Sequence, residues 1–259
     1  MTDTRDDRLR LAFAALHPDR AQQLRNRFGV GGALRYLEAQ TDVAESVRKA
    51  TTIAAEDRRT ALIAGGFNVT MRGDEDYPEH LSSLPDAPDV LFFRGSFGDV
   101  PMVAIVGTRA CSTYGRQLAA DYGAAISEAG WGVVSGLARG VDGAAHRGLI
   151  SADGVGIAVL GCGLDIDYPP EHAPLADELV ECGGAIVSEY PPGTRPEGWR
   201  FPPGKRQSDT QSPSDDMPCI AEASEVQRCP SPLDHRGSHS ANSPPVRGHR
   251  RGPSMTDAE

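Results

Sequence analysis

Two short apolar runs that each end in a small, glycine-containing turn dominate the middle of the chain. The first run, Val103–Gly107, leads into a polar, basic loop, and the second, Trp131–Val134, leads into the turn Ser135–Gly140. A helical stretch follows each turn. This alternation is typical of a parallel sheet whose turns present backbone N–H groups and helix N-termini to an anion. Each turn also carries one arginine, Arg109 or Arg139.

The same alternation of strand, turn and helix continues to about residue 188. Strands are expected at Val103–Gly107, Gly132–Ser135, Gly156–Gly161 and Gly184–Ser188, and helices at about Tyr114–Ala129, Asp142–Ser151 and Glu171–Cys182. Right-handed crossovers would join these strands in parallel. The expected fold class is therefore α/β, a Rossmann-like parallel sheet preceded by a small N-terminal helical domain.

Changes in composition divide the chain into four expected segments. Residues 1–64 predict a helical domain of the sterile-alpha or helix-hairpin-helix type, because apolar residues recur there at helix spacing. Residues 65–100 predict an extended linker that lies on the next domain, and residues 101–206 predict the Rossmann-like domain. Residues 207–259 contain no aromatic residue and show neither helix nor strand periodicity. We expect this last segment to be a disordered tail that adds nothing to the sheet and leaves one edge bare.

Within the first segment, the second helix has clear expected limits. Asp19 can cap its N-terminus, and Gly29 should end it. Leu24 and Phe28 fall on the side of this helix that should face the core. In the linker, the run Leu91–Phe93 is continuous enough to predict a strand.

The charge and cysteine content limit the classes of function. A net charge of −10 and a pI near 5.2 argue against a protein that coats nucleic acid by bulk charge, so a nucleic-acid site must be a local basic pocket. The five cysteines form no CxxC pair, which favours a reduced, cytoplasmic setting. No apolar run approaches the roughly 20 residues needed to span a bilayer, and no signal peptide is visible. We expect no membrane association.

The turns at the carboxyl ends of the predicted strands form the candidate site, because ligands of parallel sheets bind beyond those ends. Arg109 can bind a phosphate with two hydrogen bonds, and Thr108 can donate its hydroxyl. The glycine and acid pattern of a nicotinamide site is absent, and we expect no cofactor, no metal and no catalytic residue. The candidate DNA- or phosphate-binding residues are Gly107, Thr108, Arg109, Ser135, Gly136, Arg139, Gly161, Gly163, Lys205 and Arg206.

Other residues near these turns have two interpretations each. Asp142 can be the N-cap of a helix or a contact residue, and His146 lies four residues later on the same helix face. Cys162 is expected to be a small buried residue. Tyr190 and Trp199 could stack on nucleic-acid bases.

Several of these motifs, taken in order, resemble the DNA-processing protein A family, which is also called DprA or Smf. The resemblance runs from about Tyr77 to Arg200. It rests on Gly107-Thr108-Arg109, Ser135-Gly136-Leu137-Ala138-Arg139-Gly140-Val141-Asp142, Ala144-Ala145-His146, Leu160-Gly161-Cys162-Gly163-Leu164-Asp165, Tyr168-Pro169, and Ser188-Glu189 with Pro192-Gly193. It implies an extended Rossmann-like domain that binds single-stranded DNA and delivers it to the RecA recombinase during natural transformation. The implied role is not enzymatic, and the family forms homodimers.

The resemblance implies that Arg109 and Arg139 contact DNA phosphates. It ends near Phe201-Pro202-Pro203, where family members continue into Arg-Asn-Arg and a second Rossmann half. Here Gly204-Lys205-Arg206 follows instead. We therefore expect a truncation or reading-frame change after about Pro203, which would remove the half that in the family supplies further strands, much of the dimer surface and the recombinase contacts.

Two other classes of function remain open from the residues themselves. A Rossmann-like nucleotide- or phosphoribosyl-binding enzyme would use the same turns to hold a small phosphorylated ligand, with Glu189 as its acid or base. An isolated interaction module would hold no ligand.

Overall fold

The computed structural model describes residues 4–15, 18–40, 45–53, 55–84, 87–197 and 219–222. The candidate residues Lys205 and Arg206, and Trp199, lie outside the described residues. So does segment 207–259 apart from residues 219–222.

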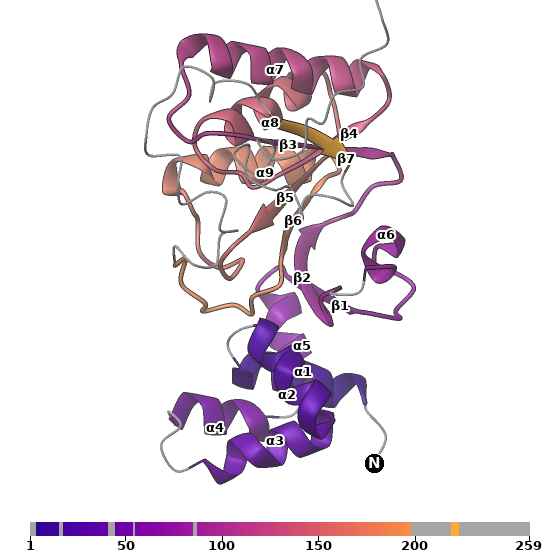
Figure 1. The fold of residues 1–259 in the computed structure, drawn as a ribbon, viewed down its shortest axis with the longest axis vertical. Helices are drawn as coiled ribbons and strands as arrows, with labels where there is room; N and C mark the ends of the chain where they lie inside the picture. The colour runs from indigo at the N-terminus through magenta and orange to yellow at the C-terminus, as the bar shows by residue number, and fades with distance from the viewer. Residues whose placement is uncertain are drawn as a thin grey trace, which may run out of the picture. The chain divides into compact units, whose positions relative to one another are not determined.

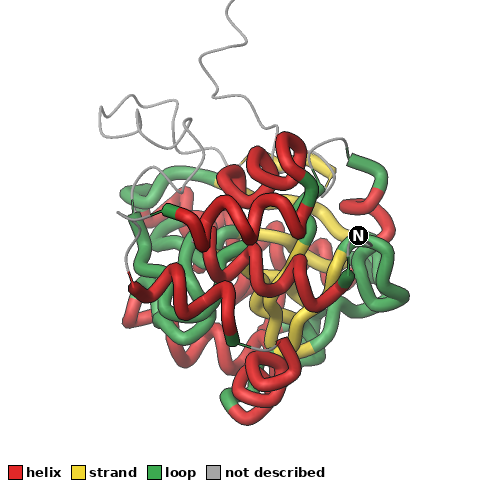
Figure 2. The backbone as a smooth tube through the Cα atoms, turned by 90° about the horizontal axis from the view of Figure 1, so that it is seen from below, coloured by secondary structure: helices red, strands yellow, loops and turns green. Residues whose placement is uncertain are grey.

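One sheet of seven strands forms the centre of the described part of the chain, in the order β1-β2-β6-β5-β4-β3-β7 (Figure 1). The strands are β1 Asn68–Met71, β2 Val90–Gly95, β3 Met102–Val106, β4 Gly132–Ser135, β5 Gly156–Leu160, β6 Ala185–Ser188 and β7 Cys219–Glu222. Strands β3 to β6 run parallel to one another, whereas β1, β2 and β7 are antiparallel additions at the two sides. Figure 2 shows the strands in yellow among the helices in red. The expected α/β class and the four parallel strands are confirmed.

Three helical connections join the parallel strands. They are α7 Thr113–Glu128, α8 Val141–Ser151, and the short 3-10 turn η1 Pro170–His172 followed by α9 Ala173–Glu181. The Ser112 hydroxyl oxygen accepts a hydrogen bond from the Gly115 N–H at 3.0 Å and caps α7. Helices α7 and α8 touch through their backbones, since a Cβ added at Gly148 would lie 1.9 Å from the Ala120 carbonyl oxygen.

The parallel strands follow one another in sequence order, so right-handed crossovers place all three connections on one face of the sheet. Apolar side chains from the strands and these helices form the main core on that face. Its largest fully buried members are Ile105, Val133, Val141, Leu149 and Leu179.

The opposite face of the sheet is covered beside β6 by the segment that we expected to be a linker. Leu91 and Phe93 of β2 pack there with Tyr77 and Val187. Further along this face, Val159 of β5 remains 40% exposed. The segment is therefore more than a linker, because its strands β1 and β2 extend the sheet. A short helix, α6 Glu79–Ser82, connects these two strands along the chain.

Strand β7 pairs antiparallel with β3 through the register Val106↔Cys219 to Val103↔Glu222. The expectation of a tail that adds nothing to the sheet and leaves its edge bare is thus wrong for residues 219–222. Four residues are too few for hydrophobic periodicity to indicate a strand. The segment is a strand because its backbone pairs with β3. For the rest of the segment, disorder remains a prediction.

The described residues of the N-terminal segment form five helices, in agreement with its helical pattern. They are α1 Arg5–Ala15, α2 Pro18–Phe28, α3 Val30–Ala39, α4 Glu45–Thr52 and α5 Ala55–Ala64. Leu11, Val30, Leu34, Leu37 and Val47 belong to their shared core. The rings of Phe13 and Phe92 meet edge to face, with centroids 5.7 Å apart, and join α1 to β2.

Two details of α2 differ from the expectation. The helix already begins at Pro18, so Asp19 lies inside it and is not its cap. Proline is favoured at the first helical position because it has no N–H to leave unpaired. Phe28, expected in the core, is 39% exposed, whereas Leu24 does pack against the core.

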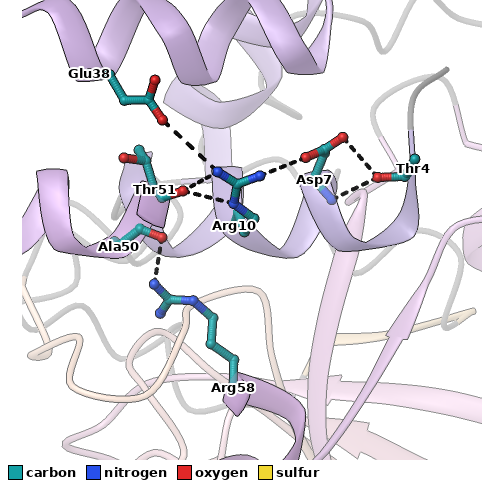
Figure 3. A network of polar contacts seen from close by, with 7 residues as sticks. All are labelled: Thr4, Asp7, Arg10, Glu38, Ala50, Thr51 and Arg58. Atoms are coloured by element: carbon teal, nitrogen blue, oxygen red, sulfur yellow. Dashed lines mark hydrogen bonds and ion pairs between the residues drawn. The ribbon is translucent and has the colours of Figure 1, made fainter. Parts of the chain in front are cut away.

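Two arginines close the C-terminal end of α4 (Figure 3). Arg10 donates from Nε to the Thr51 carbonyl oxygen at 2.8 Å and from Nη1 to Asp7 Oδ1 at 2.9 Å. Arg58 donates to the Ala50 carbonyl oxygen. The last carbonyls of a helix have no partner inside the helix and carry partial negative charge, so these cations stabilise the helix end. Burial and the nearby Arg10 charge lower the pKa of Arg58.

Candidate functional site

The turns that follow β3 and β4 are in direct contact at the carboxyl ends of the strands. The Thr108 carbonyl oxygen accepts a hydrogen bond from the Val141 N–H at 3.3 Å. Gly140 has φ +81° and ψ −125°, and a Cβ added there would lie 2.2 Å from the same oxygen. Leu137 is buried and also has a positive φ of 52°. The close approach therefore depends on a glycine in a conformation that other residues rarely adopt.

The two candidate arginines project from these adjoining turns. Both Arg109 and Arg139 are exposed. The Thr108 hydroxyl oxygen accepts a hydrogen bond from the Ala110 N–H at 3.2 Å, which shapes the turn that carries Arg109. The two turns are thus brought together at the same end of the sheet, where the carboxyl ends of β3 and β4 lie. A common phosphate site for both guanidinium groups stays a prediction.

A buried carboxylate occupies the space between the two turns. Asp142 is 0% exposed, and its two oxygens accept hydrogen bonds from the Gly107 N–H at 3.3 Å and the Gly136 N–H at 3.2 Å. The N-cap of α8 is Gly140, so the interpretation of Asp142 as a cap is wrong. The backbone N–H groups that we expected to hold a ligand's phosphate are used by the protein's own anion.

The remaining rim loops are also tied together by hydrogen bonds. The Ser135 hydroxyl donates to the Ile105 carbonyl oxygen at 2.6 Å, which joins β4 to β3. The Gly163 N–H donates to the Thr194 carbonyl oxygen at 2.8 Å. Gly161 follows β5 directly. Ser135, Gly163 and Gly161 therefore lie at the predicted ends of strands, and the first two already have partners within the protein.

The loop after β6 is held by a carboxylate from the loop after β5. Asp165 accepts the Gly193 N–H with both oxygens, at 2.8 and 2.9 Å. No group of three His, Cys, Asp or Glu residues in the described ranges is placed to hold a metal ion. Tyr190 is only 9% exposed, which leaves little of its ring to stack on a base, and Cys162 is fully buried as expected.

Arg139 forms an exposed ion pair with Glu171, which lies in η1. The Arg139 Nη2 donates to Glu171 Oε2 at 3.0 Å, and its Nε donates to Oε1, so both carboxylate oxygens are engaged. This pairing lowers the pKa of Glu171 to about 2 and raises the pKa of Arg139. The guanidinium edge that a phosphate would contact is therefore already bound to a carboxylate.

A histidine lies below the rim in the core. His146 is fully buried, and neither ring nitrogen has a hydrogen-bond partner among the described residues. Burial lowers its pKa to about 4, helped by nearby His172 and opposed by Asp142 and the Ser135 backbone. His172 instead contacts the Leu137 carbonyl oxygen through Nδ1 at 2.8 Å. His146 is thus neutral at pH 7 and far from being an exposed acid or base.

Two features of the site were missed by reasoning from sequence. Glu171 lies 32 residues from Arg139, and no spacing rule links positions so far apart. Asp142 was noticed, but its contact with Gly107 crosses 35 residues.

Within the described part of the chain, no helix is both long and apolar enough to cross a membrane.

The sequence comparisons agree with the motifs at this rim. Residues 68–207 match the family described as DNA recombination-mediator protein A. The protein Smf of Escherichia coli is 42% identical over 130 residues, which cover 49% of this chain and 35% of that protein. The DNA processing protein DprA of Bacillus subtilis is 38% identical over 140 residues, which cover 53% of this chain and 47% of that protein. The chain thus spans about a third to a half of the length of these curated relatives.

A solved structure extends the likeness beyond the matched motifs. The X-ray structure of DNA processing protein A from Streptococcus pneumoniae aligns with a TM-score of 0.53 and 27% sequence identity. The alignment covers 74% of this chain and 70% of that chain.

Proposed function

Because the chain belongs to the DNA recombination-mediator protein A family, we propose that it binds single-stranded DNA at the carboxyl-end rim of its parallel sheet. We propose further that it delivers this DNA to the RecA recombinase during natural transformation, as a mediator and not as an enzyme. The chain spans less than half of its curated relatives, so this activity is proposed for the chain on the strength of its rim.

The observation that carries the proposal is the contact between the turns that hold Arg109 and Arg139. Both side chains are exposed, and the hydrogen bond from Val141 to Thr108 holds their turns together. Arginine suits phosphate because its planar guanidinium donates two parallel hydrogen bonds. In a chain with a net charge of −10, Arg109 offers a polyanion a local contact that bulk charge does not, and Arg139 offers a second one when a phosphate displaces Glu171.

The alternative of a nucleotide- or phosphoribosyl-binding enzyme is disfavoured by Asp142. A nucleotide phosphate at the end of a Rossmann strand needs backbone N–H donors. The donors of Gly107 and Gly136 are hydrogen-bonded to the Asp142 carboxylate, and a second anion beside it would be repelled. Contacts to DNA through side chains that point outward are compatible with this arrangement.

The first test is the Arg109→Ala variant, measured by the anisotropy of a labelled oligo-dT strand over a series of salt concentrations. Binding should weaken several-fold, and the slope of log affinity against log salt should fall by about 0.7 for one lost phosphate contact. The loss should be similar for strands of different base composition, because phosphate contacts do not read bases. Arg59→Ala, which removes an equal charge from α5, is the matched control. Unchanged binding by Arg109→Ala would contradict the proposed site.

A second prediction concerns the carboxylate that competes for Arg139. Glu171→Gln removes the charge that now pairs with the guanidinium but keeps a side chain of similar size. We expect the variant to bind oligo-dT about two- to fivefold more tightly, because the phosphate no longer displaces an ion pair. The double variant Glu171→Gln with Arg139→Ala should lose this gain. A gain that persists without Arg139 would mean that Glu171 repels DNA from elsewhere on the rim.

The RecA part of the proposal has its own measurement. Assembly of RecA on a strand covered by single-stranded-DNA-binding protein should accelerate when this chain is added, and Arg109→Ala should reduce the acceleration. DNA binding without any acceleration would limit the function to binding.

A further inference from the structure

An aromatic pair lies exposed at the junction of α2 and α3. Phe28 is the last residue of α2, and Tyr36 lies in α3. Their rings are stacked with centroids 5.1 Å apart and planes 20° from parallel. Phe28 is 39% exposed and Tyr36 is 40% exposed.

The core of the helical segment does not need these rings. The buried positions of α3 are Val30, Ala33, Leu34 and Leu37, and Tyr36 lies outside this stripe. Exposing large aromatic side chains to water is unfavourable, so an exposed aromatic pair commonly marks a binding surface.

Two arginines lie beside the pair. The Arg27 guanidinium lies 5.0 Å from the centre of the Phe28 ring. The Arg35 guanidinium lies close to Gly32, at the position where a Cβ of Gly32 would also touch the Cβ of Phe28. Residues 20–36 contain four arginines and no acidic residue, although the whole chain has a net charge of −10.

We propose that the α2–α3 surface, formed by Arg27, Phe28, Arg35 and Tyr36, is a second binding surface for single-stranded DNA. Bases stack on exposed aromatic faces whatever their sequence, and arginines beside them contact phosphates and add cation–π interactions. The proposal rests on the proposed function for the class of ligand, but it uses none of the rim residues. Aromatic and arginine residues also suit a protein partner. The lack of acidic side chains in residues 20–36 favours a polyanion instead.

The test compares two strands of equal length, oligo-dT and an abasic strand that has the same phosphates but no bases. Tyr36→Ala should bind oligo-dT about tenfold more weakly, since one stacked base is lost. It should bind the abasic strand as the wild type does. Tyr36→Phe, which keeps the ring, should bind oligo-dT within about twofold of the wild type. Trp131→Ala, which removes a ring of similar exposure (42%) beside the amino end of β4, is the matched control and should change nothing.

The outcomes separate this inference from the proposed function. Unchanged binding of oligo-dT by Tyr36→Ala overturns the inference, and so does an equal loss on both strands, which would indicate a structural or protein-binding role. Loss of binding in Arg109→Ala alone leaves the rim proposal standing and removes the second surface. Base-dependent loss in Tyr36→Ala with unchanged binding in Arg109→Ala does the reverse. Melting curves followed by circular dichroism establish that each variant is folded.

Discussion

Replacement of Gly140 by alanine should lower the free energy of unfolding by about 4 kcal/mol and abolish DNA binding at the rim. Two costs add at this position. The backbone has φ +81° and ψ −125°, a region in which a residue with a Cβ is strained by about 1–3 kcal/mol. The new Cβ would also lie 2.2 Å from the Thr108 carbonyl oxygen and 2.8 Å from that of Arg109. Both are backbone atoms, so the turn that carries Arg109 must move.

Gly130→Ala is the matched control for this prediction. Gly130 also has a positive φ, +79°, but a Cβ there would meet nothing within 4 Å. We expect only the conformational cost, about 1 kcal/mol. Urea titrations of both variants give the comparison. If Gly140→Ala lost no more stability than Gly130→Ala, the two turns would not be in the close contact described.

The second large effect is a loss of stability in acid that depends on His146. Its pKa falls from the ordinary 6.5 to about 4 because burial disfavours the charged ring. An unfolded chain therefore takes up a proton near pH 6.5, while the folded protein takes it up only near pH 4. The stabilisation by the neutral ring is complete above pH 6.5 and is lost as the pH falls to 4. The shift corresponds to about 3 kcal/mol.

Urea titrations between pH 7 and pH 4 measure this loss. His146→Gln should be less stable at pH 7, since it places a polar group in the core, but its stability should vary much less over this range. Asp142 and His172 face His146 and remain in the variant. Any pH dependence that comes from these two residues should therefore also remain in the variant. The same pH dependence in the wild type and in His146→Gln would show that another group is responsible.

The parallel part of the fold could be predicted because its signals are local. Each strand is a short apolar run that ends at a glycine or serine, and the expected and observed strands agree within about one residue at β4 and β5. Strands β1 and β7 could not be found in the same way. Asn68–Met71 and Cys219–Glu222 are four-residue segments with no periodicity, and their pairing partners lie elsewhere in the sequence.

The candidate site was predicted less completely, because its contacts cross many residues. The sequence places Arg109 and Arg139 after strands that share a rim. It does not indicate that Glu171 binds Arg139 or that Asp142 joins Gly107 to Gly136. The exposure of Phe28 could not be predicted either, because its spacing of four residues from Leu24 places it on the same side of α2 as that core residue.

The order of the strands also decides how a ligand can reach the rim. In doubly wound sheets, a crevice opens where the strand order reverses and the neighbouring helices leave to opposite faces. From β3 to β6 the order runs in one direction, and beyond β3 lies β7, which presents its amino end to the rim. Between β3 and β6 the strand order therefore opens no such crevice, and the carboxyl ends of these strands carry a row of neighbouring turns. Small ligands need enclosure to bury most of their surface, whereas a row of turns can follow a long polymer as a track.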